Sequence, residues 1–182
     1  LALCKALEDF FTQHPAATLV CDGGEIGQWP QAGVTAAKKR LINGVAGAIG
    51  PSLPYALGVK VADPSQPVVA VMGDGTFGYH MAEFDTAVRY HLPIIVLIGN
   101  DARWNAEYQI QLRDYGSTRA HGCELLPARY DKVAAALGGH GEYVTDARDL
   151  PAALLRAANC GKPACINVSI ESVPAPVIRN DP

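Results

Sequence analysis

The sequence lacks the features that mark membrane proteins and nucleic-acid-binding proteins. Its apolar runs, such as PVVAVM and LPIIVLIG, span five to eight residues, whereas a membrane-spanning helix needs about 20. Lysine and arginine form no block beyond KKR at 38–40, and the formal net charge is -3. A nucleic acid or an anionic membrane would require a stronger positive patch. We therefore expect a soluble protein that binds neither.

Cysteine pairs of the kind that hold zinc are also absent. The chain has five cysteines without a C-x-x-C pair: Cys4, Cys21, Cys123, Cys160 and Cys165. Such an odd set is typical of reduced, mostly buried thiols in a cytoplasmic protein. No signal-peptide pattern opens the chain, because LALCKALEDFF carries charges within its apolar stretch and is typical of an amphipathic helix. An initiator Met is missing as well, so we expect a piece of a longer polypeptide that lacks part of the working machinery.

Apolar runs and helical patterns alternate along the chain. Four β-branched runs resemble buried strands: 17–22, 67–74, 92–101 and 163–170. Helical spacing occurs over three segments: 81–91, 128–139 and 149–161. Because the runs are apolar throughout, they suit a parallel sheet that is covered on both faces. The alternation predicts an α/β domain with three layers, α/β/α, and a mostly parallel sheet.

Length and composition indicate one domain with a short tail. The chain has 182 residues, of which 49% are apolar and 18% charged, as in a globular domain with a full core. We place this domain at 1–172 and expect an extended or disordered C-terminal tail at 173–182, where prolines recur. The glycine-rich stretch at 43–58 is too apolar for a linker and is interpreted as a loop that leads into a helix.

Polar residues follow three of the predicted strands. These strand ends read Asp22-Gly23-Gly24, Gly73-Asp74-Gly75-Thr76 and Gly99-Asn100-Asp101. In open α/β sheets, ligands bind outside the carboxyl ends of the strands, so we expect all three ends at one edge of the sheet.

Two of these strand ends carry carboxylates that would face each other. Asp101 lies 27 positions beyond Asp74, with one predicted helix between them. Adjacent carboxylates repel unless a cation lies between them, and a hard cation such as Mg²⁺ takes oxygen ligands of this type. The backbone N–H groups of Gly75 and Thr76 and the Thr76 hydroxyl suit phosphate oxygens. The residues alone thus predict a phosphorylated ligand held through a metal, although glycine and aspartate also end many strands for conformational reasons.

Three separate segments resemble one enzyme family. Gly-Asp-Gly, the helix AEFDTAVRYHLPI and the strand that ends in Asn-Asp are similar to the cofactor motif of thiamine-diphosphate enzymes. The resemblance is strongest to the acetolactate-synthase-like group, which includes benzoylformate decarboxylase and benzaldehyde lyase. It extends from DGGEIGQW through GAIGPSLPYALG to PACINVSIE. It implies a thiamine-diphosphate-binding fold, the C-terminal diphosphate-binding domain, and the cofactors thiamine diphosphate and Mg²⁺.

The resemblance also assigns metal ligands and cofactor contacts. It implies that Mg²⁺ binds the side chains of Asp74 and Asp101 and the backbone carbonyl of Arg103. The family usually has Asn-Asn where this chain has Asn100-Asp101, so one ligand is a carboxylate here. The remaining implied cofactor contacts are Glu25, Ile26, Gly27, Gly47, Ile49, Gly73, Gly75 and Thr76. Among them, Ile49 would wedge the cofactor into a bent shape, while the Gly47 carbonyl and the Ile49 amide grip its pyrimidine edge.

The implied function is that of a lyase, decarboxylase or carboligase, and thus of a lyase or transferase, on 2-oxo acids or 2-hydroxy ketones. No catalytic residue is assigned in this chain, because the family's activating glutamate belongs to a pyrimidine-binding domain of the same or a neighbouring chain. A homo-oligomer is therefore expected. Two alternatives stay open: a separate subunit of a two-chain 2-oxo acid decarboxylase or oxidoreductase, and a non-catalytic phosphate- or nucleotide-binding module.

Several polar residues near the motifs allow more than one interpretation. His80 follows the Gly-Asp-Gly turn closely enough to lie near the cofactor, but we expect it to be a polar residue at a helix start. Trp104, Glu107 and Gln109 follow the second strand end in a region that borders the substrate pocket in the family. They equally suit a surface helix with one packed tryptophan, and both interpretations stay open.

Overall fold

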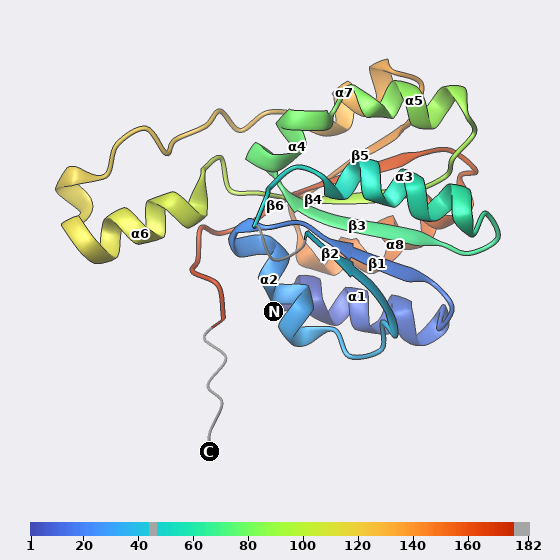
Figure 1. Ribbon diagram of the computed structural model, residues 1–182, viewed down its shortest axis with the longest axis horizontal. Helices are drawn as coiled ribbons and strands as arrows, with labels where there is room; N and C mark the ends of the chain where they lie inside the picture. Colours follow the sequence, from blue (N-terminus) through green and yellow to red (C-terminus); the bar gives the residue numbers. More distant parts are fainter. Residues whose placement is uncertain (44–46, 177–182) are drawn as a thin grey trace.

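The computed structural model describes residues 1–43 and 47–176 and contains one parallel sheet (Figure 1). Its strands lie in the order β2-β1-β3-β4-β6-β5. They are β1 (Thr18–Cys21), β2 (Lys39–Ile42), β3 (Val68–Gly73), β4 (Ile95–Asn100), β5 (His140–Val144) and β6 (Ala164–Ser169). Every pairing between neighbours is parallel. The predicted three-layer α/β/α fold is therefore confirmed.

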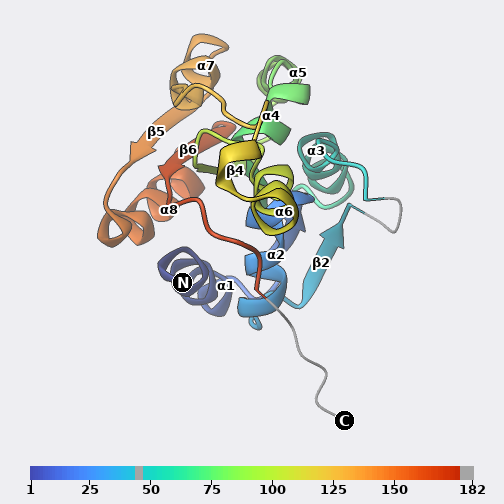
Figure 2. The same ribbon diagram turned by 90° about the vertical axis from the view of Figure 1, so that its left-hand side faces the viewer.

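Helices cover both faces of the sheet (Figures 1 and 2). They are α1 (Ala2–Gln13), α2 (Gly24–Gly33), α3 (Ser52–Ala62), α4 (Asp74–His80), α5 (Glu83–Arg89), α6 (Asn105–Tyr115), α7 (Tyr130–Ala136) and α8 (Leu150–Asn159). Helices α1, α2 and α8 lie on one face, and α3, α4, α5 and α7 on the other. Helix α6 extends away from the sheet and buries none of its residues.

Strand β3 shows how the two apolar layers form. Val69 and Val71 pack into the core beneath α1 and α8, and Ala70 and Met72 pack into the opposite core. Successive side chains of a strand point to opposite faces, so an uninterrupted apolar run fills both cores. Strands β1, β3, β4 and β6 were predicted for this reason.

The helix predicted at 81–91 is α5, and a further short helix, α4, precedes it. Helix α4 starts at Asp74 directly after β3, and α5 follows from Glu83. Helix α4 was not predicted, because apolar spacing begins only after its glycines. His80 accordingly ends α4 instead of starting a helix, and its Nδ1 lies 2.9 Å from the Gly50 carbonyl oxygen.

The first helix, the cysteines and the glycine-rich stretch agree with the sequence-based expectations. The amphipathic first helix buries Leu7, Phe10 and Phe11. All five cysteines are free, and only Cys160 is not buried. Within 1–43 and 47–176, no helix is long and apolar enough to cross a membrane. The glycine-rich stretch leads into α3 as predicted, although 44–46 lie outside the described residues.

Candidate functional site

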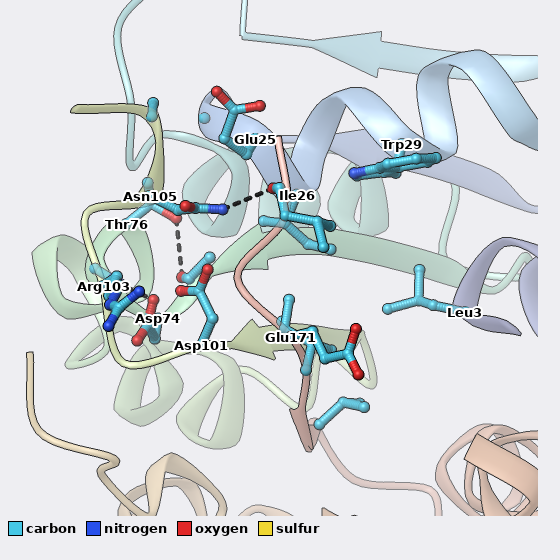
Figure 3. A pocket seen from close by; sticks show the side chains of 18 of the residues that line it. Leu3, Glu25, Ile26, Trp29, Asp74, Thr76, Asp101, Arg103, Asn105 and Glu171 are labelled. Atoms are coloured by element: carbon cyan, nitrogen blue, oxygen red, sulfur yellow. Dashed lines mark hydrogen bonds between the residues drawn. The ribbon is translucent and has the colours of Figure 1, made fainter. Parts of the chain in front are cut away.

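The carboxyl ends of β3 and β4 bring the two predicted carboxylates together. These strands are neighbours, and Gly73 is in register with Gly99. Asp74 and Asp101 therefore leave the same edge of the sheet and line one cavity of about 790 Å³. In Figure 3 they gather with Arg103 at one end of the cavity, and Leu3 and Trp29 lie at the other.

Nearly all predicted cofactor contacts line this cavity. The lining includes Glu25, Ile26, Gly47, Ile49, Gly73, Asp74, Gly75, Thr76, Asp101 and Arg103. Gly27 does not belong to the lining. A Cβ atom at Gly27 would lie 1.9 Å from the Asp22 backbone oxygen. The structure thus gives this glycine a close packing contact between α2 and the end of β1.

One carboxylate oxygen of Asp74 lacks a hydrogen-bond donor in the described part of the chain. The residue is 1% exposed, and its Oδ1 accepts a hydrogen bond of 2.9 Å from the Gly75 N–H. Its Oδ2 is buried and finds no hydrogen-bond partner among the described residues. Burial and the nearby Asp101 carboxylate raise the pKa of Asp74 to about 6. A buried, unpaired oxygen is costly, and a cation at this point would relieve both the missing contact and the charge repulsion.

Asp101 and Arg103 lie on a tight turn after β4. Burial raises the pKa of Asp101, while the Ser172 side chain and the Arg103 backbone amide act in the opposite direction. The same amide also lowers the pKa of Asp74, so it acts on both carboxylates. Ala102, between the two predicted ligands, has a φ of 54°. This left-handed conformation is unfavourable for a residue with a side chain and costs about 1 kcal/mol.

The described residues offer a metal only a small set of charged ligands. Within residues 1–43 and 47–176, no group of three or more His, Cys, Asp or Glu side chains could hold a metal ion. A cation at Asp74 and Asp101 would therefore need further oxygen ligands from the backbone, from water or from a bound ligand. Mg²⁺ is commonly bound in this way, through one or two carboxylates and substrate phosphates.

The residues after Asp74 are partly committed to local contacts. The Thr76 hydroxyl donates a hydrogen bond of 3.0 Å to the Gly73 carbonyl, and the Gly75 N–H is used by Asp74. Gly75 also supports the ring of Trp104, since a Cβ atom there would lie 2.6 Å from Trp104 Cζ3. Trp104 is therefore a packed residue that also lines the cavity, and the two interpretations of its role are compatible.

Asp22 holds the loop that carries Ile49, a role that we did not assign from the sequence. Its fully buried carboxylate accepts hydrogen bonds from the backbone N–H groups of Gly23, Gly50 and Ser52, at 2.7, 2.9 and 3.1 Å. Ser52 is the first residue of α3. The only sequence signal was the position of Asp22 at the end of a strand beside the other polar strand ends.

A second cavity of about 260 Å³ adjoins the first. It is lined by Ile49, Tyr79, Trp104, Glu107, Gln111, His121, Gly122 and Cys123. Ile49, Trp104 and Glu107 line both cavities. Gln109, which was considered together with Trp104 and Glu107, lines neither and instead donates a hydrogen bond of 3.0 Å to Asn105 Oδ1.

The chain after β6 crosses the site. Ser172 donates a hydrogen bond of 2.8 Å to Asn105 Oδ1, and Asn105 Nδ2 donates one of 2.8 Å to the Val173 carbonyl. The Ala175 N–H donates to the Glu25 carboxylate. The described part of the predicted tail, 173–176, is thus held between the first turns of α2 and α6, and 177–182 lie outside the described residues.

Comparisons with known proteins agree with this architecture. A family model described as "Thiamine pyrophosphate enzyme, C-terminal TPP binding domain" matches residues 22–168. The chain is 42% identical over 129 residues to the acetolactate synthase large subunit IlvG of Mycobacterium tuberculosis, which covers 70% of this chain and 23% of that protein. It is 38% identical over 132 residues to 2-hydroxyacyl-CoA lyase 2 of Bos taurus, which covers 70% of this chain and 21% of the relative.

The chain therefore spans about a quarter or less of the length of these relatives. The resemblance inferred from the Gly-Asp-Gly and Asn-Asp motifs is confirmed, and thiamine diphosphate is the cofactor of the family. This chain belongs to the family of C-terminal thiamine-pyrophosphate-binding domains of thiamine pyrophosphate enzymes.

Proposed function

We propose that this chain holds thiamine diphosphate and Mg²⁺ in an enzyme that breaks or forms a C–C bond beside a carbonyl group. The observation that carries the proposal is the unpaired Asp74 Oδ2, which is buried next to Asp101 in a cavity of about 790 Å³. The substrates would be 2-oxo acids or 2-hydroxy ketones, and the enzyme a lyase or a transferase. The names of the relatives, acetolactate synthase and 2-hydroxyacyl-CoA lyase, support this choice.

Each site residue has a distinct proposed task. Asp74, Asp101 and the Arg103 carbonyl would bind the metal, and the strand-end residues from Gly73 to Thr76 would surround the diphosphate. Ile49 would support the bent cofactor from the loop that Asp22 holds. When bound, thiamine diphosphate supplies the electron sink for C–C bond cleavage. The protein binds and orients it and excludes water from the reacting atoms.

Further parts of the enzyme lie outside this chain. We propose that the activating glutamate comes from a pyrimidine-binding domain of the same or a neighbouring chain, in a homo-oligomer. The length of the relatives leaves ample room for such a domain. The cavity shared by Trp104 and Glu107 beside Ile49 would receive part of the substrate.

Titration of thiamine diphosphate into the full-length protein tests this function. After metal removal with EDTA, calorimetry should detect weak binding at most, and Mg²⁺ should strengthen it at least tenfold. ADP carries the same diphosphate on a nucleoside and serves as the matched control. We expect it to bind at least tenfold more weakly than thiamine diphosphate. Equal affinity for both would favour a nucleotide-binding module, and no binding under any condition would contradict the proposal.

Replacement of Ile49 by Ala in the full-length enzyme should reduce turnover more than cofactor affinity. The smaller side chain no longer supports the bent cofactor, and a misplacement of about 1 Å can cost about 100-fold in rate. We expect kcat to fall about 10- to 100-fold while the thiamine diphosphate Kd changes less than about threefold. Ile42→Ala, at a 43% exposed position on β2, is the matched control and should change neither. Equal losses of rate and affinity would argue against this role.

A further inference from the structure

A network of buried polar side chains lies beneath the turn that carries Asp101 and Arg103. Asn100 ends β4, Asn167 lies on the neighbouring strand β6, and Asp131 is in the first turn of α7. Their exposed fractions are 7%, 0% and 4%. None of the three lines either cavity. They therefore reach a bound ligand only through other residues.

The acceptors around Asn167 fix the orientation of its amide group. Asn167 Nδ2 donates to the Ala128 carbonyl at 3.0 Å and to Asp131 Oδ1 at 3.3 Å. A carbonyl and a carboxylate accept hydrogen bonds and cannot donate them. Arg129 holds the Asp131 carboxylate in place through two hydrogen bonds, of 2.8 and 2.7 Å. The amide nitrogen of Asn167 must therefore face these groups, and its oxygen must face Asn100.

This orientation determines the orientation of Asn100 in turn. Asn100 Nδ2 donates to Asn167 Oδ1 at 3.1 Å and to the Ala128 carbonyl at 2.9 Å. The Asn100 amide oxygen then accepts a hydrogen bond of 3.2 Å from the backbone N–H of Ala102. If the Asn100 amide turned over, its NH₂ group would face that N–H and two acceptors would face each other. Asn167 and the Ala128 carbonyl together thus select the one orientation of Asn100 that supports the turn.

The supported turn has a conformation that its residues do not favour. Ala102 has a φ of 54°, in the left-handed region that side chains rarely adopt. A second contact, from the Leu125 N–H to the Ala102 carbonyl at 2.7 Å, also holds it. Asp101 and Arg103 lie on either side of this residue, so the turn decides how both face the cavity.

We propose that Asn167, acting through Asn100, is a positioning residue that fixes the 101–103 turn in the orientation needed to bind the metal. The inference rests on the proposed function, because it assumes the metal at Asp74 and Asp101. When a residue that contacts a metal ligand is lost, the metal affinity typically falls about 10- to 100-fold. Asn167 is two contacts from the turn, and its loss would leave the Ala128 carbonyl as the one remaining acceptor, among the described residues, for the Asn100 amide nitrogen.

The test measures the Mg²⁺ concentration that half-saturates thiamine diphosphate binding to the full-length protein. Asn167→Leu keeps the branched shape of the side chain but removes the donors and the acceptor, and it should raise this concentration about tenfold. Ile166→Ala is the matched control, since Ile166 is equally buried on β6 but packs into the opposite core. This control should lower the unfolding temperature and leave the half-saturating concentration within twofold.

Hydrogen exchange of the metal-free protein provides a readout that does not need the cofactor. The Ala102 and Arg103 amides should exchange at least tenfold faster in Asn167→Leu than in the wild type, and at the wild-type rate in Ile166→Ala. If the leucine variant fails to fold, the same measurements are made on Asn167→Ser, which is smaller and replaces the amide with one hydroxyl.

The outcomes separate this inference from the proposed function. A wild-type protein without Mg²⁺-dependent binding would contradict the proposed function, and with it the inference. Wild-type binding that depends on Mg²⁺, combined with Asn167 variants whose half-saturation stays within twofold of it, would overturn the inference alone. A loss of thermal stability without a change in half-saturation would mean that Asn167 has only a structural role.

Discussion

Replacement of Asp74 by Ala is expected to abolish Mg²⁺-dependent binding of thiamine diphosphate while the fold stays intact. Asp74 lines the cavity next to Asp101, and within 1–43 and 47–176 one of its buried oxygens has no hydrogen-bond partner. Loss of a direct ligand should cost more than the 10- to 100-fold typical of outer contacts, so we expect at least about a 100-fold loss of affinity. Calorimetric titration of the full-length variant at saturating Mg²⁺ measures this loss.

Two further variants show whether the loss belongs to this carboxylate. Asp101→Asn restores the pair of residues usual in the family, and it should change the affinity for the metal only mildly. Asp85→Ala removes an exposed carboxylate of α5 that pairs with Arg89, and it should have no effect on binding. Unchanged cofactor affinity in Asp74→Ala, or a complete loss in Asp101→Asn, would contradict the proposed ligand set.

The sequence predicted those parts of the fold whose residues are buried on both sides. Strands β1, β3, β4 and β6 have continuous apolar runs and were recognised from them. Strands β2 and β5 were missed because they form the two edges of the sheet, where KRLI is exposed throughout and HGEYV is mostly polar. Helix α4 was not recognised, because its two glycines conceal a helix start directly after the end of β3.

The same distinction applies to the site. The carboxylates and glycines at the strand ends carry a local pattern, which placed Asp74 and Asp101 near each other. The roles of Asp22 and Asn167 depend on contacts with residues 28 and 67 positions away. No local spacing encodes such contacts, so the supports of the Ile49 loop and of the 101–103 turn became visible only in the folded chain.

Replacement of Asp74 by Asn should stabilise the metal-free protein at neutral pH, although it removes a proposed ligand. Burial and the Asp101 charge raise the pKa of Asp74 to about 6 from its ordinary value of 3.8. The folded state therefore binds the proton of the Asp74 carboxyl more tightly than the unfolded state does. The stability that the protonated Asp74 carboxyl contributes to the folded state is fully present below pH 3.8, and it is lost as the pH rises through 6. A difference of about 2 pKa units corresponds to about 3 kcal/mol, so we expect a gain of about 1–3 kcal/mol.

Hydrogen exchange of the β3 and β4 amides in EDTA measures the opening free energy of this region in the full-length protein. The gain should be largest near pH 7.5 and should vanish below pH 4, where Asp74 is protonated in both states. Asp22→Asn is the matched control with the opposite sign, because both oxygens of Asp22 accept backbone hydrogen bonds and an amide can accept with only one. Asp22→Asn should lose about 1–3 kcal/mol of stability.

Mg²⁺ should stabilise the wild type and leave the stability of Asp74→Asn unchanged. A destabilised Asp74→Asn would show that the fold, and not a cation, requires this carboxylate.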